Sequence, residues 1–114
     1  MKNIELATIE RSLDFATYQA LFAEASPAYT DKQTSFLPLN ARRMDRLLKK
    51  DRTLAKAAEQ IQQISRPVHI LVVTEPWCGD AAQIIPPLLQ LVEKNEQISL
   101  SFSLRDQEPK LIDA

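Results

Sequence analysis

Glycine is almost absent from this chain, whose 114 residues include one, Gly79. Average usage is about 7%. Loops that bind dinucleotides or nucleoside triphosphates need several glycines, because the backbone must approach the phosphates closely. The sequence therefore excludes both of these nucleotide-binding modes.

Cysteine and histidine are equally scarce, with one residue of each, Cys78 and His69. A single cysteine cannot form an internal disulfide, and this pattern is most simply that of a cytoplasmic protein. One cysteine and one histidine are also too few soft ligands for a structural zinc site. We therefore expect a cytoplasmic location, no bound metal and no cofactor.

Long apolar runs and a strong excess of charge are missing too. The longest uninterrupted apolar stretch, residues 70–73, is far shorter than the ~20 residues that a membrane span needs. The N-terminal residues lack the apolar core of a secretory signal. The formal net charge of -1 gives no electrostatic reason to expect nucleic acid. Neither a membrane nor a nucleic acid is an expected partner.

The C-terminal part contains a strand, a helix and a second strand. Residues 68–74 form a β-branched run that is typical of a parallel strand covered on both faces. A helix is predicted from Cys78 to about Lys94. Alternation of apolar residues with serines predicts a second strand over residues 98–104. Such a βαβ unit is parallel and right-handed in nearly all cases, so the fold class is α/β.

The first quarter of the chain has a weaker pattern. Loose alternation predicts extended backbone over residues 3–9. Ser12 is expected to be the N-cap of a helix over residues 13–25, in which aromatic and aliphatic residues recur at helical spacing. The pair Ser26-Pro27 should end that helix.

Two further helices are expected before the first strand. Residues 36–39 are interpreted as an irregular segment that packs on the core, followed by a helix capped by Asn40. Asp51 falls on the apolar face of that helix, which indicates a break. Residues 54–64 then have a clean apolar stripe, including Leu54.

Cys78 stands where the first strand gives way to the helix. A thiol at a helix N-terminus lies near unpaired N–H groups and the positive end of the dipole, and both favour the thiolate. Cys78 is therefore the candidate nucleophile, with Trp77, Gly79 and Asp80 shaping the site. Ala81 occupies the place where a second cysteine would complete a Cys-x-x-Cys pair, so the motif cannot close its own disulfide.

A family resemblance rests on these residues. The run Trp77-Cys78-Gly79-Asp80-Ala81 resembles the thioredoxin active-site motif Trp-Cys-Gly-Pro-Cys, carried on the same strand–turn–helix. The resemblance implies a thioredoxin-like fold and thiol–disulfide exchange through Cys78.

The similarity extends beyond the motif. Pro86 lies eight residues after the cysteine, where thioredoxins carry a proline that bends the helix. The matched stretch covers about residues 67–104, and the helical N-terminus resembles that of a bacterial thioredoxin-like subfamily with Trp-Cys-Gly-Asp motifs. The expected organisation is one folding unit, with a helical N-terminal extension over residues 1–66 and a partial thioredoxin-like core over residues 67–114.

The chain also departs from the family pattern. Thioredoxins carry a buried aspartate on the preceding strand, where this chain has Val72, and Asp80 places a negative charge beside the thiol. Family members continue with a helix, a cis-proline loop, a hairpin and a final helix, so the core is expected to be incomplete at its C-terminus. A sheet of two strands leaves edges unpaired, which favours association such as a homodimer.

Other candidate sites are less favoured by the sequence. His69 lies at the far end of the strand from Cys78, so a cysteine–histidine dyad is not expected. Glu75 and Asp80 flank the thiol but lack the third element that hydrolysis or metal binding would need. The basic residues around Arg42 and Arg46 are interpreted as a solvated helix face.

Two functions remain as hypotheses. The first is a monothiol thioredoxin-like protein that exchanges disulfides through Cys78 with a protein or a low-molecular-weight thiol as its partner. The second is a non-catalytic binding module of the same fold, such as a homodimer.

Overall fold

The computed structural model describes residues 4–113 and contains a two-stranded parallel sheet. Strands β1 (Val68–Thr74) and β2 (Ile98–Leu104) pair along their whole length and are joined by helix α5 (Gly79–Val92). The two strands and the crossover helix lie where the sequence predicted them, and the α/β fold class is confirmed.

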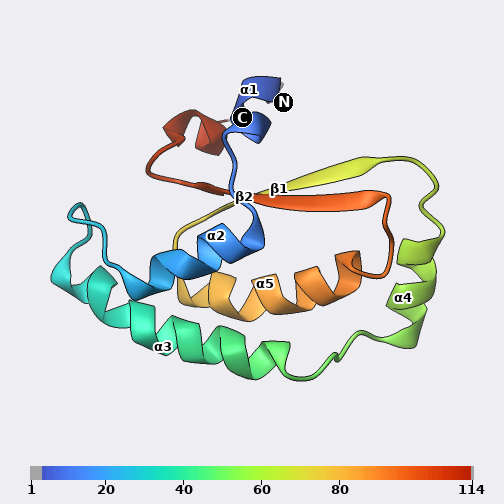
Figure 1. Cartoon of the computed structure of the whole chain (residues 1–114), viewed down its shortest axis with the longest axis horizontal. Helices are drawn as coiled ribbons and strands as arrows, with labels where there is room; N and C mark the ends of the chain where they lie inside the picture. Colours follow the sequence, from blue (N-terminus) through green and yellow to red (C-terminus); the bar gives the residue numbers. More distant parts are fainter. Residues whose placement is uncertain (1–3, 114) are drawn as a thin grey trace.

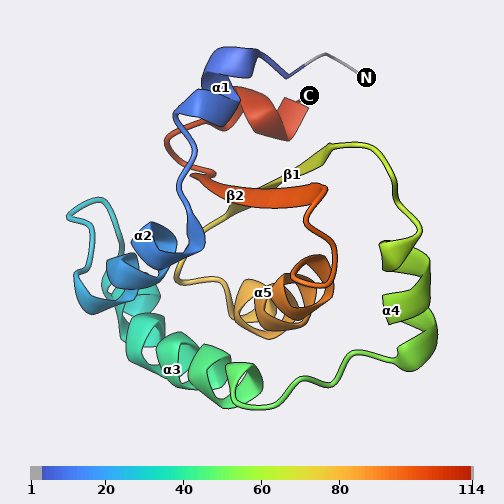
Figure 2. The ribbon, with the colours of Figure 1, turned by 45° about the vertical axis from the view of Figure 1, so that its right-hand side comes forward.

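Helices lie on both sides of this sheet (Figures 1 and 2). One side carries α5 together with α2 and α3, and the other carries α1 beside a C-terminal 3-10 helix, with α4 at the end of the sheet. None of the helices in this described part is long and apolar enough to cross a lipid bilayer. The remaining elements are α1 (Leu6–Glu10), α2 (Phe15–Ala20), η1 (Leu21–Ala23), α3 (Asp31–Leu48), α4 (Ala55–Gln62) and η2 (Pro109–Asp113).

The hydrophobic core lies between the sheet and the layer formed by α2, α3 and α5. Its centre is an aromatic pair in which the ring of Tyr18 stacks on that of Phe102, with centroids 4.9 Å apart. Met44 of α3 and Ile85 of α5 complete the same buried cluster. The helical N-terminal half and the strand–helix–strand unit therefore share one core.

The opposite face of the sheet carries the serines of β2 beside Leu71 and Val73 of β1, and it is only partly covered. Ser101 and Ser103 of β2 are buried, whereas His69 and Ser99 are exposed. The ring nitrogens of His69 each lie 2.7 Å from a serine hydroxyl, those of Ser99 and Ser101. The expectation that β1 is covered on both faces is therefore wrong, because α1 and η2 are too short to span this face.

The N-terminal segment differs from its prediction. Residues 6–10 form α1, whereas extended backbone was expected over residues 3–9, of which residue 3 lies outside the described part. The alternation of apolar residues does not reflect burial here, because Ile4 is 46% and Leu6 is 69% exposed. The buried residue of this helix is Thr8. Arg11 then forms an ion pair of 2.9 Å with Glu108, which joins the two ends of the described chain.

The start of α2 also differs. Asp14, and not Ser12, caps the helix by accepting a hydrogen bond from the amide of Thr17 at 2.8 Å. Ser12 instead donates to the hydroxyl of Ser101 at 2.7 Å. The expected helix over residues 13–25 is shorter, because α2 ends at residue 20 and continues only as η1.

The largest error concerns α3, which begins nine residues before the expected cap. Thr30 and Gln33 form a capping box, in which each side chain accepts a hydrogen bond from the other residue's amide. The helix then runs through Pro38, although a proline inside a helix loses one hydrogen bond. Burial of Leu37 and Met44 offsets that loss. Residues 36–39 are therefore helical.

Side-chain amides fix the ends of the helices around α5. Gln90 donates to the carbonyl oxygens of Leu47 and Lys50, both at 3.1 Å, and so satisfies the last turn of α3. Asn95, which follows the predicted end of α5 at about Lys94, donates to two carbonyl oxygens at the end of α4, at 2.7 and 2.8 Å. Leu54, expected on the apolar stripe of α4, precedes that helix and is 75% exposed.

Candidate functional site

The site is built on the turn that connects β1 to α5. The amide of Cys78 donates to the carbonyl oxygen of Glu75 at 3.0 Å, which closes the turn. Cys78 is then the N-cap of α5, with extended backbone and a half-buried, free thiol. Its side chain makes no capping hydrogen bond. Cys78 therefore stands immediately before the first residue of α5, which is the position that the sequence predicts for it.

A cavity of 340 Å³ lies beside Cys78. Its walls come mainly from apolar side chains of β1 and α5, including Ile84 and Leu88, and its rim includes Trp77 and Asp80. Ile84 is 62% exposed although it is a large aliphatic residue. The cavity can accept an apolar group next to the thiol.

Trp77 closes one side of the turn. The guanidinium carbon of Arg105 lies 5.1 Å from the centroid of the indole ring, which is the geometry of a cation–π contact. The indole Nε1 is buried and has no hydrogen-bond partner among the described residues. The ring is thus held between the turn and the segment that follows β2.

Gly79 provides space for a neighbouring helix. Its φ angle is not positive, so the turn does not need the conformational freedom of glycine. A Cβ atom at this position would lie 3.0 Å from Nη1 of Arg43 and 3.8 Å from Oδ1 of Asn40. The absence of a side chain lets these two α3 residues approach the turn closely.

Asn40 connects α3 to the turn. It is fully buried, its Nδ2 donates to the carbonyl oxygen of Pro76 at 3.0 Å, and its Oδ1 accepts from Arg43 at 3.1 Å. The prediction that Asn40 caps a helix is wrong, because it lies inside α3. No local pattern in the sequence signals this role, which depends on a residue 36 positions away.

Glu75 is a buried carboxylate immediately before the turn and is 3% exposed. One oxygen accepts from the hydroxyl of Tyr29 at 2.7 Å, and the other accepts from the amide of Asp106 at 3.1 Å. Val72, which aligns with the buried aspartate of thioredoxins, packs against the hydrophobic core. The buried acid of this site is therefore three residues later in the chain.

Two tyrosines near the turn have raised pKa values. Burial, together with the hydrogen bond to Glu75, raises the pKa of Tyr29 well above its usual range. Burial raises the pKa of Tyr18 to about 12, against the effect of its hydrogen bond with Thr74. The contact of Tyr29 with Glu75 is not predicted from the sequence, because the residues around Tyr29 resemble a polar linker. The local signal nearest to it is the capping box of Thr30 and Gln33, which marks the start of the next helix.

The structure keeps the less favoured candidates apart. His69 is engaged by serines at the opposite end of β1 from Cys78, so it cannot act as its base. Glu75 is buried, whereas Asp80 is exposed in the first turn of α5. Within the described residues, no group of three or more histidine, cysteine and acidic side chains is placed to hold a metal ion.

Comparison with known proteins identifies the family of this chain. No curated protein and no solved structure matches the chain. A family model described as thioredoxin matches residues 26–114, which include β1, the Cys78 turn, α5 and β2. The match covers most of the chain and includes the parallel strand–helix–strand unit together with α3 and α4. The chain therefore belongs to the thioredoxin family.

Proposed function

We propose that this chain is a monothiol protein that exchanges disulfides through Cys78. The observation that supports the proposal is the position of this thiol, half-buried and free at the N-cap of a 14-residue helix beside an apolar cavity. Amides and the dipole of such a helix favour the thiolate, which is the nucleophile in disulfide exchange.

The reaction has two steps. The thiolate of Cys78 attacks one sulfur of a disulfide, the S–S bond breaks, and the other sulfur leaves as a thiolate that takes a proton from solvent. Cys78 is then held in a mixed disulfide. Because residue 81 is alanine and the chain has no other cysteine, a second thiol from solution must attack this bond to release Cys78.

The neighbouring residues support this chemistry in different ways. Trp77 shields the turn, and Gly79 lets α3 approach it, while the carboxylate of Asp80 opposes the thiolate. The partner is a protein or a low-molecular-weight thiol or disulfide. A cytoplasmic location suits such a protein, because thiols are kept reduced there.

The pH dependence of alkylation tests the proposal. The rate at which iodoacetamide labels Cys78 is measured by mass spectrometry from pH 5 to pH 10, with Cys78→Ser as the unlabelled control. A half-maximal rate below pH ~7.5 supports an activated thiol, whereas one at or above ~8.5, the value of a free cysteine, contradicts it.

A non-catalytic interaction module, in the form of a homodimer, is the second candidate. The outer edge of β1 favours it, because this edge has no partner strand within the described residues. Sedimentation velocity distinguishes the two candidates. A stable dimer whose Cys78 reacts no faster than a free cysteine would favour the interaction module.

A further inference from the structure

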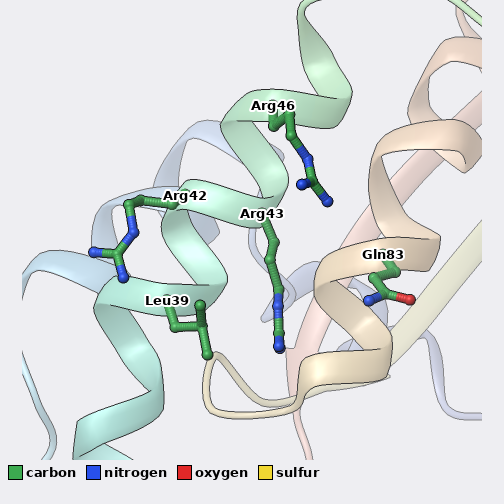
Figure 3. A pocket seen from close by; sticks show the side chains of 5 residues that line it. All are labelled: Leu39, Arg42, Arg43, Arg46 and Gln83. Carbon is green, nitrogen blue, oxygen red and sulfur yellow. The ribbon is translucent and has the colours of Figure 1, made fainter.

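A second cavity, of 460 Å³, lies between α3 and α5 and carries three guanidinium groups (Figure 3). In Figure 3, Arg43 and Arg46 extend from α3 toward α5, while Arg42 points away from them. None of the three forms an ion pair within the part of the chain that the structure describes. Arg42 and Arg46 are exposed, as a solvated face requires, and both are among the residues that line the cavity. The cavity is therefore lined by positive charges that no carboxylate pairs with in this part of the chain.

One residue of this cavity, Arg43, reaches the turn that carries the thiol, whereas Cys78 itself lines the other cavity. Nη1 of Arg43 lies 3.0 Å from the place of a Cβ on Gly79, the residue after Cys78. The same nitrogen donates to Asn40 at 3.1 Å, which anchors the guanidinium. A guanidinium has five N–H donors, so most of them stay available to a ligand. A fixed cation thus stands beside the first residue of α5.

We propose that this cavity binds the carboxylates of a small anionic disulfide and presents its sulfur to Cys78. Arginine binds carboxylates through two parallel hydrogen bonds, and the amide of Gln83 supplies a further polar group. The volume is within the range of about 300–1,000 Å³ that small-molecule sites have, which favours a low-molecular-weight ligand over a protein. The proposal rests on the proposed function, because Cys78 must react.

The reaction balances with two reactants, the bound disulfide and a second small thiol from solution. The Cys78 thiolate attacks one sulfur of the bound disulfide R–S–S–R, in which R bears carboxylates. The S–S bond breaks, R–S⁻ leaves and is protonated by solvent, and Cys78 becomes Cys78–S–S–R. The thiolate of a second small thiol, R′–SH, then attacks the sulfur that belongs to R. The S–S bond to Cys78 breaks, R–S–S–R′ leaves, and Cys78 is again a free thiol.

Three disulfides that differ in charge test the proposal. Mass spectrometry measures how fast Cys78 forms a mixed disulfide with oxidised glutathione, which is anionic, with neutral 2-hydroxyethyl disulfide and with cationic cystamine, at low salt. For each disulfide, the rate at Cys78 is divided by the rate at which the same disulfide reacts with the free thiol N-acetylcysteine. This ratio should be largest for the anionic disulfide. Added salt should reduce this preference, because it screens charge.

Variants of the cavity give the sharper result. Arg46→Gln should lower the ratio of anionic to neutral rates about threefold, and Arg43→Gln combined with Arg46→Gln about tenfold. Arg52→Gln removes an exposed arginine that does not line the cavity and should leave the ratio unchanged. The side chain of Arg46 makes no hydrogen bond within the described residues, whereas that of Arg43 donates to Asn40. Arg46→Gln alone therefore keeps the test valid if Arg43→Gln destabilises the fold.

A binding measurement separates this inference from the proposed function. Calorimetry follows S-methylglutathione, which cannot exchange disulfides, as it binds the Cys78→Ser protein. Saturable binding that weakens in Arg46→Gln supports the site. Absence of binding, with equal rates for the three disulfides, overturns the inference and leaves the proposed function standing. Binding without any reaction at Cys78 overturns the proposed function and, with it, the delivery of a disulfide to the thiol.

Discussion

Replacement of Asn40 by alanine should destabilise the protein strongly, because this side chain is the buried connection between α3 and the turn. The variant leaves the carbonyl oxygen of the buried Pro76 without its donor and opens a cavity. An unpaired buried acceptor costs about 1–3 kcal/mol, and the lost packing brings the total to about 2–4 kcal/mol. At about 4 °C per kcal/mol, the melting temperature should fall by roughly 8–16 °C.

Urea denaturation measures this loss. The fluorescence of Trp77, the single tryptophan of the chain, reports unfolding of the site itself, and circular dichroism reports the whole fold. Asn95→Ala is the matched control, because it also removes an amide that donates to backbone carbonyl oxygens, in this case two at the end of α4 and not one at the turn. Both variants should lose stability, and only Asn40→Ala should change the alkylation rate of Cys78 under native conditions. An unfolding free energy for Asn40→Ala within about 0.5 kcal/mol of the wild type would refute the reasoning.

Three further predictions concern local electrostatics and capping. Thr30→Ala removes the cap of α3 and should lower the unfolding free energy by about 1 kcal/mol, measured by thermal denaturation; an unchanged melting temperature would show that the cap is dispensable. Tyr18 and Tyr29, the two tyrosines of the chain, have raised pKa values, so the folded protein should show little tyrosinate absorbance at pH ~10–11. These phenols contribute their full stability below pH ~10, the pKa of tyrosine in the unfolded chain, and lose it as the pH rises toward their pKa values in the folded protein. Appearance of tyrosinate absorbance with a midpoint near pH ~10 would contradict this prediction. The hydrogen bond from Lys94 holds the pKa of Asp51 well below its usual range, so its contribution is present above pH ~4 and is lost as the pH falls. Asp51→Asn should therefore be less stable than the wild type at pH 6, and the two should become equally stable in strong acid. A difference in unfolding free energy that does not change with pH would show that the charge of Asp51 does not contribute.

The elements that the sequence predicted correctly are those whose signals are local. The apolar run of β1, the serine alternation of β2 and the apolar face of α5 each specify an element without help from distant residues. The position of Cys78 at a helix N-terminus follows from the same local pattern. These elements lie within the family match and form the central part of the site.

The errors come from residues whose role depends on distant partners. Pro38 and Asn40 look locally like a break and a cap, yet Asn40 lies inside a helix because its amide binds the carbonyl of Pro76. The capping box of Thr30 and Gln33 is the local signal that marks the true start of α3. The contacts of Glu75 with a tyrosine 46 residues away have no local signal at all.

The family match begins at residue 26, but the folded unit does not. Leu13 exchanges two backbone hydrogen bonds with Phe102, at 2.7 and 2.8 Å, and so occupies part of the outer edge of β2, while Tyr18 covers the ring of the same phenylalanine. A version of this protein trimmed to the matched region would uncover an aromatic surface and an open strand at once. Such a fragment should self-associate through that strand, so the segment that contains Leu13 and Tyr18 protects the protein from aggregation.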